Sequence, residues 1–185
     1  MATQMSRPKP ETYSRPFIAL HWFMAVLIAA VFATIELREY FPKGSDPREQ
    51  LKALHFMLGL SVLILAVLRI ILRAREADPP IVPPMGTAQK AIALGLHLAL
   101  YAVMLVMPVL GWLTLSAAGK PVPFFGLALP ALIAENKELA ENLKEAHEFI
   151  GTIFYYLIGI HILAALFHHY GSRDNTLTRM LPRRS

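Results

Sequence analysis

Four long apolar stretches limit what this chain can fold into. Each holds about 20 residues, which is enough for a helix to cross a hydrocarbon core of roughly 30 Å. Because 55% of the residues are hydrophobic, we predict an all-α integral membrane protein that forms a single domain over residues 1–185. The spans of this four-transmembrane-helix bundle are expected at residues 17–37, 53–73, 92–115 and 149–169. The segment "ALIAENKELAENLKEAHEF" predicts a short amphipathic helix that runs into the fourth span.

Basic residues are distributed unevenly between the two sides of the predicted bundle. An even number of spans places both termini on one side, together with the loop between the second and third spans. The positive-inside rule therefore places both termini in the cytoplasm. This orientation explains the net charge of +5 without a nucleic-acid partner. The basic tail "RMLPRRS" is expected to contact anionic lipid head groups. The termini side holds eleven basic residues and the other side seven: Arg7, Lys9, Arg15, Arg69, Arg73, Arg75, Lys90, Arg173, Arg179, Arg183 and Arg184 against Arg38, Lys43, Arg48, Lys52, Lys120, Lys137 and Lys144.

All seven histidines lie in or beside the predicted spans, where an ionisable side chain is rare and usually functional, and four of them match in depth. His147 and His161 stand fourteen residues apart, so they share one helix face and lie about 21 Å apart along its axis. His55, near the outer end of its span, matches the depth of His147. His21 matches the depth of His161, which gives two histidine pairs stacked across the membrane.

Two histidines at one site suit haem iron better than a zinc ion bound by protein ligands alone. A structural zinc ion normally takes four protein ligands, and the chain has no cysteine and no mid-span carboxylate to complete such a set. Haem iron needs only two axial ligands, and its flat macrocycle fits between the helices of a bundle. We therefore predict two haem b groups per chain, one at each pair, with no thioether attachment. Cations for the propionates of the cytoplasmic haem are expected from Arg15, Arg69 and Arg73.

Other interpretations of individual histidines stay open. A single histidine within a membrane is often only a hydrogen-bond donor between helices. His97 has no partner of its own, so it either supports a haem ligand or replaces His21 as the ligand. His168 follows His161 by seven residues on nearly the same face and is expected to border the cytoplasmic haem site. His169 is expected to be a polar residue at the membrane interface.

The sequence resembles the bacterial cytochrome b561 family over almost the whole chain from about Ser14. The family's motif histidines match the four that depth selects. The resemblance implies a bacterial inner-membrane oxidoreductase that passes electrons through two haem b groups to ubiquinone, with superoxide oxidised to dioxygen at the periplasmic face. The outer loop after Gly119 departs from the pattern. The stretches that carry the resemblance are "HW" at His21–Trp22, "ELREYFPKGSDPR", "LHFMLGLSVLILAVLRIILR", "PPIVPP", "HLALYAVMLVMPVLGW" and "IGIHILAALFHHYGSRDNTLTRMLPRR".

This resemblance directs attention to two substrate sites. Superoxide is a small anion that local positive charge can steer, and Lys43, Arg48 and Lys52 cluster just before His55. The outer side as a whole holds nine acidic against seven basic residues, so the attraction must be local. At the cytoplasmic end, His168 is expected to contact ubiquinone, because an imidazole can deliver protons near neutral pH.

The expected partners are therefore membrane lipid, ubiquinone and superoxide, and the chain is expected to act as a monomer. A second interpretation is a cytochrome b electron-transfer subunit of a quinone-linked dehydrogenase or hydrogenase, although the short loops offer little docking surface. A third is a haem-free transport protein whose histidines relay protons. A reduced-minus-oxidised absorbance spectrum would separate the third interpretation from the two redox interpretations.

Overall fold

Four long helices dominate the computed structural model, which describes residues 10–182. Each helix is long and apolar enough to cross a membrane, and this confirms the predicted membrane bundle. Every helix also extends beyond its predicted span, because polar residues continue the helix outside the apolar stretch. The four helices are α1 (Arg15–Leu37), α2 (Asp46–Arg75), α3 (Thr87–Ala117) and α4 (Lys137–Tyr170).

A short β-hairpin interrupts the otherwise helical fold. Strand β1 (Val122–Phe124) pairs antiparallel with β2 (Leu127–Leu129) in the connection between α3 and α4. Two single-turn 3-10 helices, η1 (Arg38–Tyr40) and η2 (Thr178–Met180), complete the elements of residues 10–182. The all-α prediction holds for the spans but missed the hairpin, because its apolar, proline-containing sequence lacks the alternation that marks a strand.

Residues that favour helix starts determine where two of the helices begin. The Ser14 hydroxyl accepts a hydrogen bond from Phe17 N at 3.4 Å, and Pro16 occupies the first turn of α1, where no N–H is needed. Asn136 caps α4 by accepting a hydrogen bond from Leu139 N at 3.0 Å. The predicted amphipathic segment is therefore continuous with the fourth span from the first residue of α4 onward.

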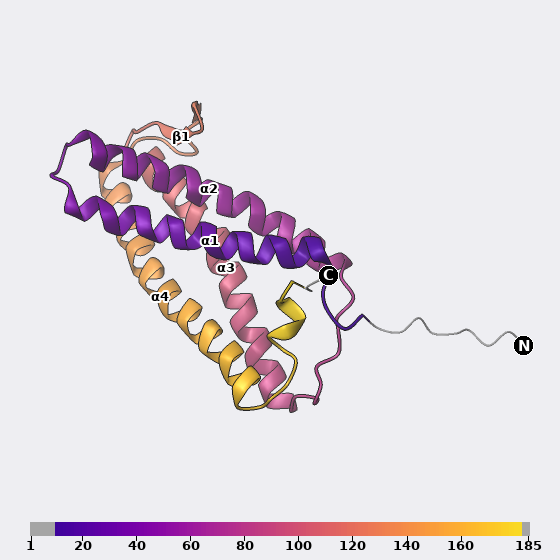
Figure 1. Cartoon of the computed structure of the whole chain (residues 1–185). Coiled ribbons are helices and arrows are strands. Elements are labelled where there is room, and N and C mark those ends of the chain that lie inside the picture. Colours follow the sequence, from indigo (N-terminus) through magenta and orange to yellow (C-terminus); the bar gives the residue numbers. More distant parts are fainter. Residues whose placement is uncertain (1–9, 183–185) are drawn as a thin grey trace, which may run out of the picture.

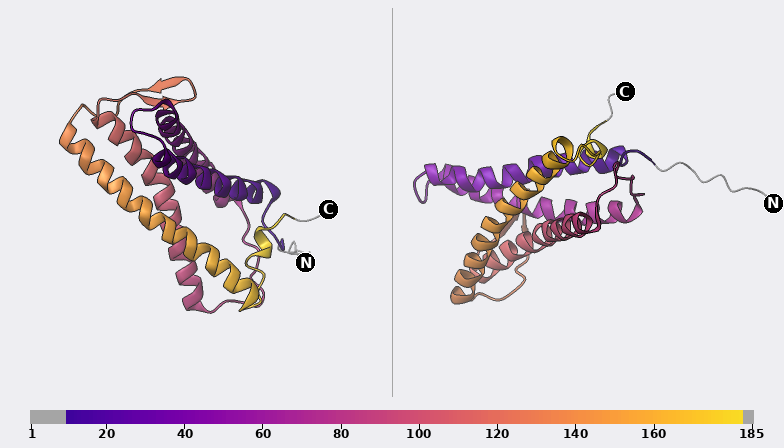
Figure 2. Two further views of the ribbon diagram at one scale, coloured as in Figure 1. Left: turned by 60° about the vertical axis from the view of Figure 1, so that its left-hand side comes forward. Right: turned by 90° about the horizontal axis from the view of Figure 1, so that it is seen from below.

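Neighbouring helices pack in chain order. Helix α1 lies antiparallel to α2, α2 contacts α3, and α3 lies antiparallel to α4 (Figure 1 and Figure 2). Helices α1 and α4 meet mainly through side chains, including Phe32 and Tyr155, whose ring centroids are 3.9 Å apart. The Tyr155 hydroxyl also donates a hydrogen bond to Glu36 at 3.1 Å. Side chains rather than close backbone packing therefore join α1 to α4.

A small apolar core lies in the middle of the bundle. Many other large apolar side chains of the helices are exposed, as expected for a surface that faces lipid. Phe154 stands seven residues after His147 and seven before His161, so the core lies between the depths of these two histidines. Every helix contributes to the buried members of this core, which are Met24, Val62, Ala66, Met104 and Phe154.

Polar contacts join three segments at the end of the bundle where α1 begins and α4 ends. Val82 N donates a hydrogen bond to the Asn175 side chain at 2.8 Å, and Asn175 N donates to Val82 O at 3.1 Å. Arg179 is buried and donates to Pro79 O at 2.5 Å. Tyr13 N donates to Arg179 O at 3.3 Å, and the Tyr13 hydroxyl donates to Asp78 at 3.1 Å. We define the terminal cap as residues 13–14, 76–82 and 174–180. Four of the basic residues used in the orientation argument lie outside the described residues: Arg7, Lys9, Arg183 and Arg184.

Candidate functional site

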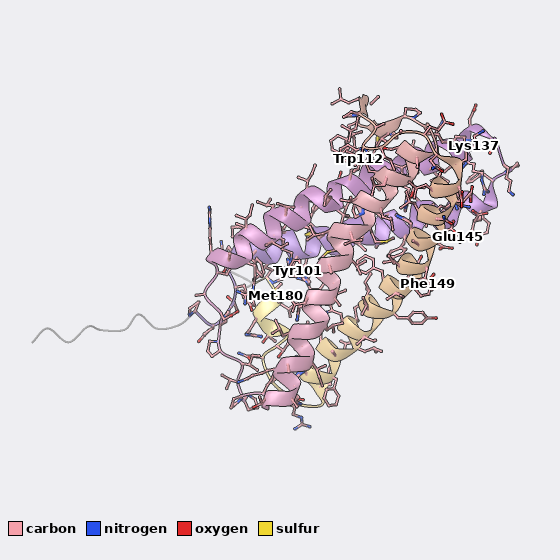
Figure 3. The ribbon with its side chains drawn as sticks, turned by 180° about the vertical axis from the view of Figure 1, so that it is seen from behind. Tyr101, Trp112, Lys137, Glu145, Phe149 and Met180 are labelled. Atoms are coloured by element: carbon pink, nitrogen blue, oxygen red, sulfur yellow. The ribbon has the colours of Figure 1, made fainter. Side chains whose placement is uncertain are left out.

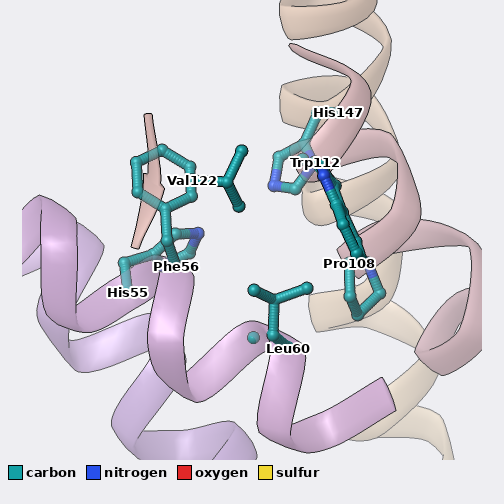
Figure 4. Close-up of a pocket in the computed structure, with 9 residues that line it drawn as sticks. His55, Phe56, Leu60, Pro108, Trp112, Val122 and His147 are labelled. Atoms are coloured by element: carbon teal, nitrogen blue, oxygen red, sulfur yellow. The ribbon is translucent and has the colours of Figure 1, made fainter. Parts of the chain in front are cut away.

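His55 of α2 and His147 of α4 face each other across a pocket (Figure 4). Their ring centroids lie 6.2 Å apart, and the ring planes meet at 72°. The pocket is a cavity of about 30 Å³ with a mainly apolar lining. The structure thus brings together the first predicted pair. Residues that line the pocket beside the histidines include Phe56, Leu60, Pro108, Gly111, Trp112 and Val122.

Local contacts orient both rings of this pair. Nδ1 of His55 lies 3.0 Å from the Val31 carbonyl, and because a carbonyl can only accept, Nδ1 carries the hydrogen and Nε2 keeps its lone pair. The His147 ring lies against Gly111, where a Cβ atom would come within 3.4 Å of Cε1. Nδ1 of His147 is buried and lacks a well-aligned hydrogen bond among residues 10–182. Each ring therefore retains a nitrogen that can bind a ligand.

The β-hairpin supplies one wall of the pocket. Val122 of β1 is 1% exposed and reaches into the space between His55 and His147 (Figure 4). Phe124 and Leu129 pack against the buried cluster that contains Val122. An apolar loop residue carries no sign of a site in the sequence, so this wall could not be predicted.

His21 of α1 and His161 of α4 form a second pair close to the terminal cap. Their ring centroids are also 6.2 Å apart, with ring planes at 68°. Trp22, which follows His21, donates a hydrogen bond to Met180 O at 2.8 Å. This bond attaches η2 to α1 beside the pair. The second predicted pair is therefore brought together as well.

The spacing in both pairs fits one metal ion between two imidazoles. Histidine nitrogens about 2.0 Å from a shared metal place the ring centroids about 6 Å apart, and both pairs show 6.2 Å. Within residues 10–182, no group of three or more His, Cys, Asp or Glu side chains surrounds a metal position. Two histidine ligands per site are sufficient for haem iron, because the porphyrin supplies the other ligands. The residues present therefore fit two haem groups.

His97 of α3 lies close to the second pair but fits a ligand role less well. Its ring centroid is 5.3 Å from that of His161, which is shorter than the separation of about 6 Å expected across a shared metal. Nδ1 of His97 donates to Ala93 O at 2.6 Å in the same helix. Of the two alternatives that the sequence left open, the geometry favours His21 as the ligand and His97 as a neighbour of His161.

The three cations predicted to serve the second site differ in their surroundings. Arg69 holds its guanidinium 4.4 Å from the centre of the Phe17 ring, and its buried Nη1 has no hydrogen bond among the described residues. Arg73 pairs with Asp78 at 2.5 Å, and the hydrogen bond from Arg73 holds the pKa of Asp78 below its usual value. Arg15 is exposed at the start of α1. Arg69 is therefore the cation best placed to receive a carboxylate.

His168, near the end of α4, is paired with an acid that was not predicted from the sequence. Its Nδ1 lies 2.6 Å from Oδ2 of Asp174, and the two side chains are only 12% and 3% exposed. Burial alone would raise the pKa of Asp174, but hydrogen bonds from Thr176 and His168 outweigh it and lower the pKa. The dyad thus joins an ionised carboxylate to an imidazole. The only available signal was that Asp174 is the first acid after the helix end.

The three outer cations predicted to steer an anion do not form a cluster of unpaired charges. Arg48 is buried, donates to two backbone carbonyls at 2.9 Å and binds Glu39 at 3.0 Å. Lys52 pairs with Glu49 at 2.6 Å. Lys43 is exposed and makes no ion pair within residues 10–182. That all three residues steer an anion stays a prediction. Lys43, exposed and without an ion pair among the described residues, is the best placed of the three to do so.

Spanning helices that hold facing pairs of histidines define a membrane-bound cytochrome of the b type. The family model described as prokaryotic cytochrome b561 matches residues 12–183. The chain belongs to this family, as the sequence resemblance predicted. It is therefore a bacterial membrane protein that binds b-type haem and takes part in electron transfer.

Three curated relatives cover nearly the same length. Cytochrome b561 homolog 1 of Escherichia coli (strain K12) is 39% identical over 172 residues, which are 93% of this chain and 98% of the relative. Probable superoxide oxidase CybB of Yersinia pestis is 36% identical over 172 residues, 93% of this chain and 97% of the relative. Cytochrome b562 of Cereibacter sphaeroides is 30% identical over 174 residues, which are 91% of this chain and 94% of the relative.

Replacing Gly111 with leucine should displace the His147 ring, because a Cβ atom at this position already reaches 3.4 Å from the ring. We expect the haem affinity of this site to fall at least about tenfold, which pyridine haemochrome absorbance of the purified protein would measure. Gly95→Leu is the matched control, since a Cβ there meets no atom within 4 Å. Full haem content in Gly111→Leu would contradict this view of the site.

Proposed function

We propose that the chain is a superoxide:ubiquinone oxidoreductase that binds two haem b groups. The observation that carries this proposal is the equal 6.2 Å spacing of two histidine pairs at different depths of one bundle. His55 and His147 would hold one haem, and His21 and His161 the other. Each haem would supply a one-electron carrier. Two carriers at different depths are what a protein needs to connect reactions at the two faces of a membrane.

The proposed reaction moves single electrons from superoxide to a quinone. Two superoxide anions each lose one electron and become dioxygen. One ubiquinone takes up both electrons together with two protons and becomes ubiquinol. The similarity to a relative named a probable superoxide oxidase supports this choice of substrates. One end of the bundle must therefore admit a small anion, and the other end must deliver protons.

The His168–Asp174 dyad is the proposed source of these protons. Asp174 accepts a hydrogen bond from Nδ1 of His168, so it orients the ring. The protonated Nε2 can then donate to a quinone oxygen as that oxygen gains negative charge. His168 lies seven residues beyond His161, about 10 Å along the same helix. A quinone bound there would be close to the second histidine pair.

We further infer that the His55–His147 pair lies towards the periplasm of a bacterial inner membrane. Eleven of the 18 Lys and Arg residues belong to the termini side, which the positive-inside rule assigns to the cytoplasm. The terminal cap and His168 then face the cytoplasm, where protons are taken up. Lys43, in the loop after α1, then lies on the periplasmic side. A monomer suffices for this arrangement, because one chain forms both pairs.

A second candidate is an electron-transfer subunit that receives electrons from a docked dehydrogenase or hydrogenase. The first part of α4 exposes several glutamates, and Figure 3 shows Glu145 and Phe149 projecting away from the bundle. Such a surface would repel superoxide but would suit a basic protein. Copurification of a partner in fixed ratio would favour this candidate. The haem-free proton relay conflicts with membership of a haem-binding family.

Haem content should depend on the four paired histidines and not on His97. The parent protein should bind two haem b groups by pyridine haemochrome assay. His55→Ala or His147→Ala should remove one haem, and His21→Ala or His161→Ala the other, because a single remaining axial ligand holds haem weakly. His97→Ala is the control and should keep both. A fully loaded His161→Ala protein, or loss of haem from His97→Ala, would show that the assignment is wrong.

Quinone reduction should depend on the His168–Asp174 dyad. In stopped-flow experiments, His168→Ala and Asp174→Asn should leave reduction by superoxide unchanged and slow reoxidation by ubiquinone roughly 100-fold, as expected for loss of a proton donor. His169→Ala is the matched control, since it changes the neighbouring histidine only. Normal reoxidation in both dyad variants would place the quinone elsewhere.

Superoxide consumption should depend on Lys43. Lys43→Gln should lower the rate about two- to threefold at low salt, with the difference disappearing at high ionic strength because salt screens exposed charges. Lys137→Gln removes one exposed charge from the start of α4 and serves as control. Equal rates for the Lys43 variant and the parent at every salt concentration would remove Lys43 from the mechanism.

A further inference from the structure

The connection between α3 and α4 contains an uninterrupted apolar segment. Residues 121–134, "PVPFFGLALPALIA", include no charged, hydroxyl or amide side chain, and we call them the apolar hairpin. Connections that lie in water normally carry polar turn residues such as Asn, Asp and Ser. The composition of the apolar hairpin therefore points to an environment other than water.

The tip of the apolar hairpin carries a side chain that its turn does not favour. Phe125 and Gly126 connect the paired residues Phe124 and Leu127, and both have positive φ angles, 46° and 87°. A two-residue turn of this kind normally has Asn-Gly or Asp-Gly, because a bulky residue is strained there. Phe125 is nevertheless 60% exposed. An aromatic ring at this position is therefore expected to make contacts outside the protein.

The apolar hairpin lies beside α2 rather than beyond its end (Figure 1). Phe125 N lies 3.2 Å from Sδ of Met57, and Val122 shares a buried cluster with Leu60. Met57 and Leu60 stand well inside α2, which begins at Asp46, and both belong to the apolar span. The hairpin therefore lies at the depth of a surface that faces lipid.

The outward face of the apolar hairpin matches that lipid-facing surface. Phe125 and Leu127 are 60% and 67% exposed, and α2 exposes Leu54 and Ile64 on either side of Met57 in the sequence. No charged side chain of the hairpin interrupts this surface. Large exposed apolar surfaces are rare in contact with water and mark sites of association with protein or membrane.

The backbone of the apolar hairpin suits a membrane because many of its polar groups have partners. The two strands pair with each other from Val122–Leu129 to Phe124–Leu127. Pro130 O accepts a hydrogen bond from Trp112 Nε1 at 2.9 Å. Non-helical backbone at membrane depth is tolerated only where its polar groups are satisfied in this way. Three further N–H groups are absent altogether, at Pro121, Pro123 and Pro130.

We propose that the apolar hairpin is embedded in the membrane, that lipid acyl chains cover Phe125 and Leu127, and that this contact holds Val122 over the His55–His147 pocket. Lipid fits better than a protein partner, because the face continues the lipid-facing helices and offers no charge or hydrogen-bonding side chain for recognition. The hairpin then acts as a lid on the lipid side, and it excludes lipid-soluble molecules from the pocket.

Spin labels can test the position of the hairpin, because the chain has no cysteine of its own. Phe125→Cys and Leu127→Cys would carry a nitroxide label in lipid nanodiscs. Collision with dioxygen, which concentrates in lipid, and with a nickel chelate, which stays in water, would be measured by electron paramagnetic resonance. Both labels should resemble Ile64→Cys, an exposed position in α2, and should differ from Lys43→Cys in the loop after α1.

The possible outcomes separate the candidate occupants. Collision of the Phe125 and Leu127 labels with the nickel chelate at the level of Lys43→Cys would overturn the proposal. Strong dipolar coupling between labels on different chains would show that a second copy covers the face, and would overturn it as well. Phe125→Trp retains an aromatic ring if the cysteine variants fold poorly. Its added fluorescence should be quenched by brominated lipid, and absence of quenching would count against the proposal.

A second experiment tests the lid itself without relying on haem. Val122→Cys should react very slowly with a water-soluble maleimide, because Val122 is 1% exposed. Adding Phe125→Asp should draw the hairpin out of the lipid and raise the rate at least about tenfold. Adding Lys120→Asp instead, at an exposed charged position next to the segment, should leave the rate unchanged. Equal rates for Val122→Cys with and without Phe125→Asp would show that lipid contact does not hold the lid.

Discussion

The pairing of two imidazoles from α4 with partners on two other helices is the constraint on which the rest of the bundle depends. His147 and His161 occupy one face of a single helix, so their separation is fixed by helix geometry at about 21 Å. Helix α2 must bring His55 to the first and α1 must bring His21 to the second. Both facing distances are 6.2 Å. The direct packing of α1 against α2 lets both helices meet these requirements at different depths.

Much of this arrangement could be predicted from the sequence because it depends on helical periodicity and depth alone. The four spans, the positions of His55 and His147 and the match with His21 and His161 all follow from counting residues along straight helices. The alternative in which His97 replaces His21 could not be decided in this way, since both lie near the same depth. The distances to His161, 6.2 Å and 5.3 Å, and the hydrogen bond from His97 to Ala93 distinguish them.

The features that the sequence did not reveal lie in connections, where local pattern says little about long-range contacts. Arg48 looked like a free surface cation, yet its hydrogen bonds to backbone carbonyls and Glu39 make it a structural residue of the loop after α1. In the sequence, Asp174 is one polar residue among several after the end of α4, and only the fold brings it to His168. Val122 carried no chemical signal at all. In each case the role depends on a partner that no periodicity predicts.

The apolar core between the two histidine pairs has a consequence for bioenergetics. Its five buried residues, Met24, Val62, Ala66, Met104 and Phe154, contain no group that could pass a proton along. Electrons can cross such a layer over short distances, whereas protons need a chain of water or polar side chains. With the proposed function, the protein would therefore carry charge between the two faces as electrons, while these five residues offer no path for protons. A cell that maintains a proton gradient would lose little of it through this bundle.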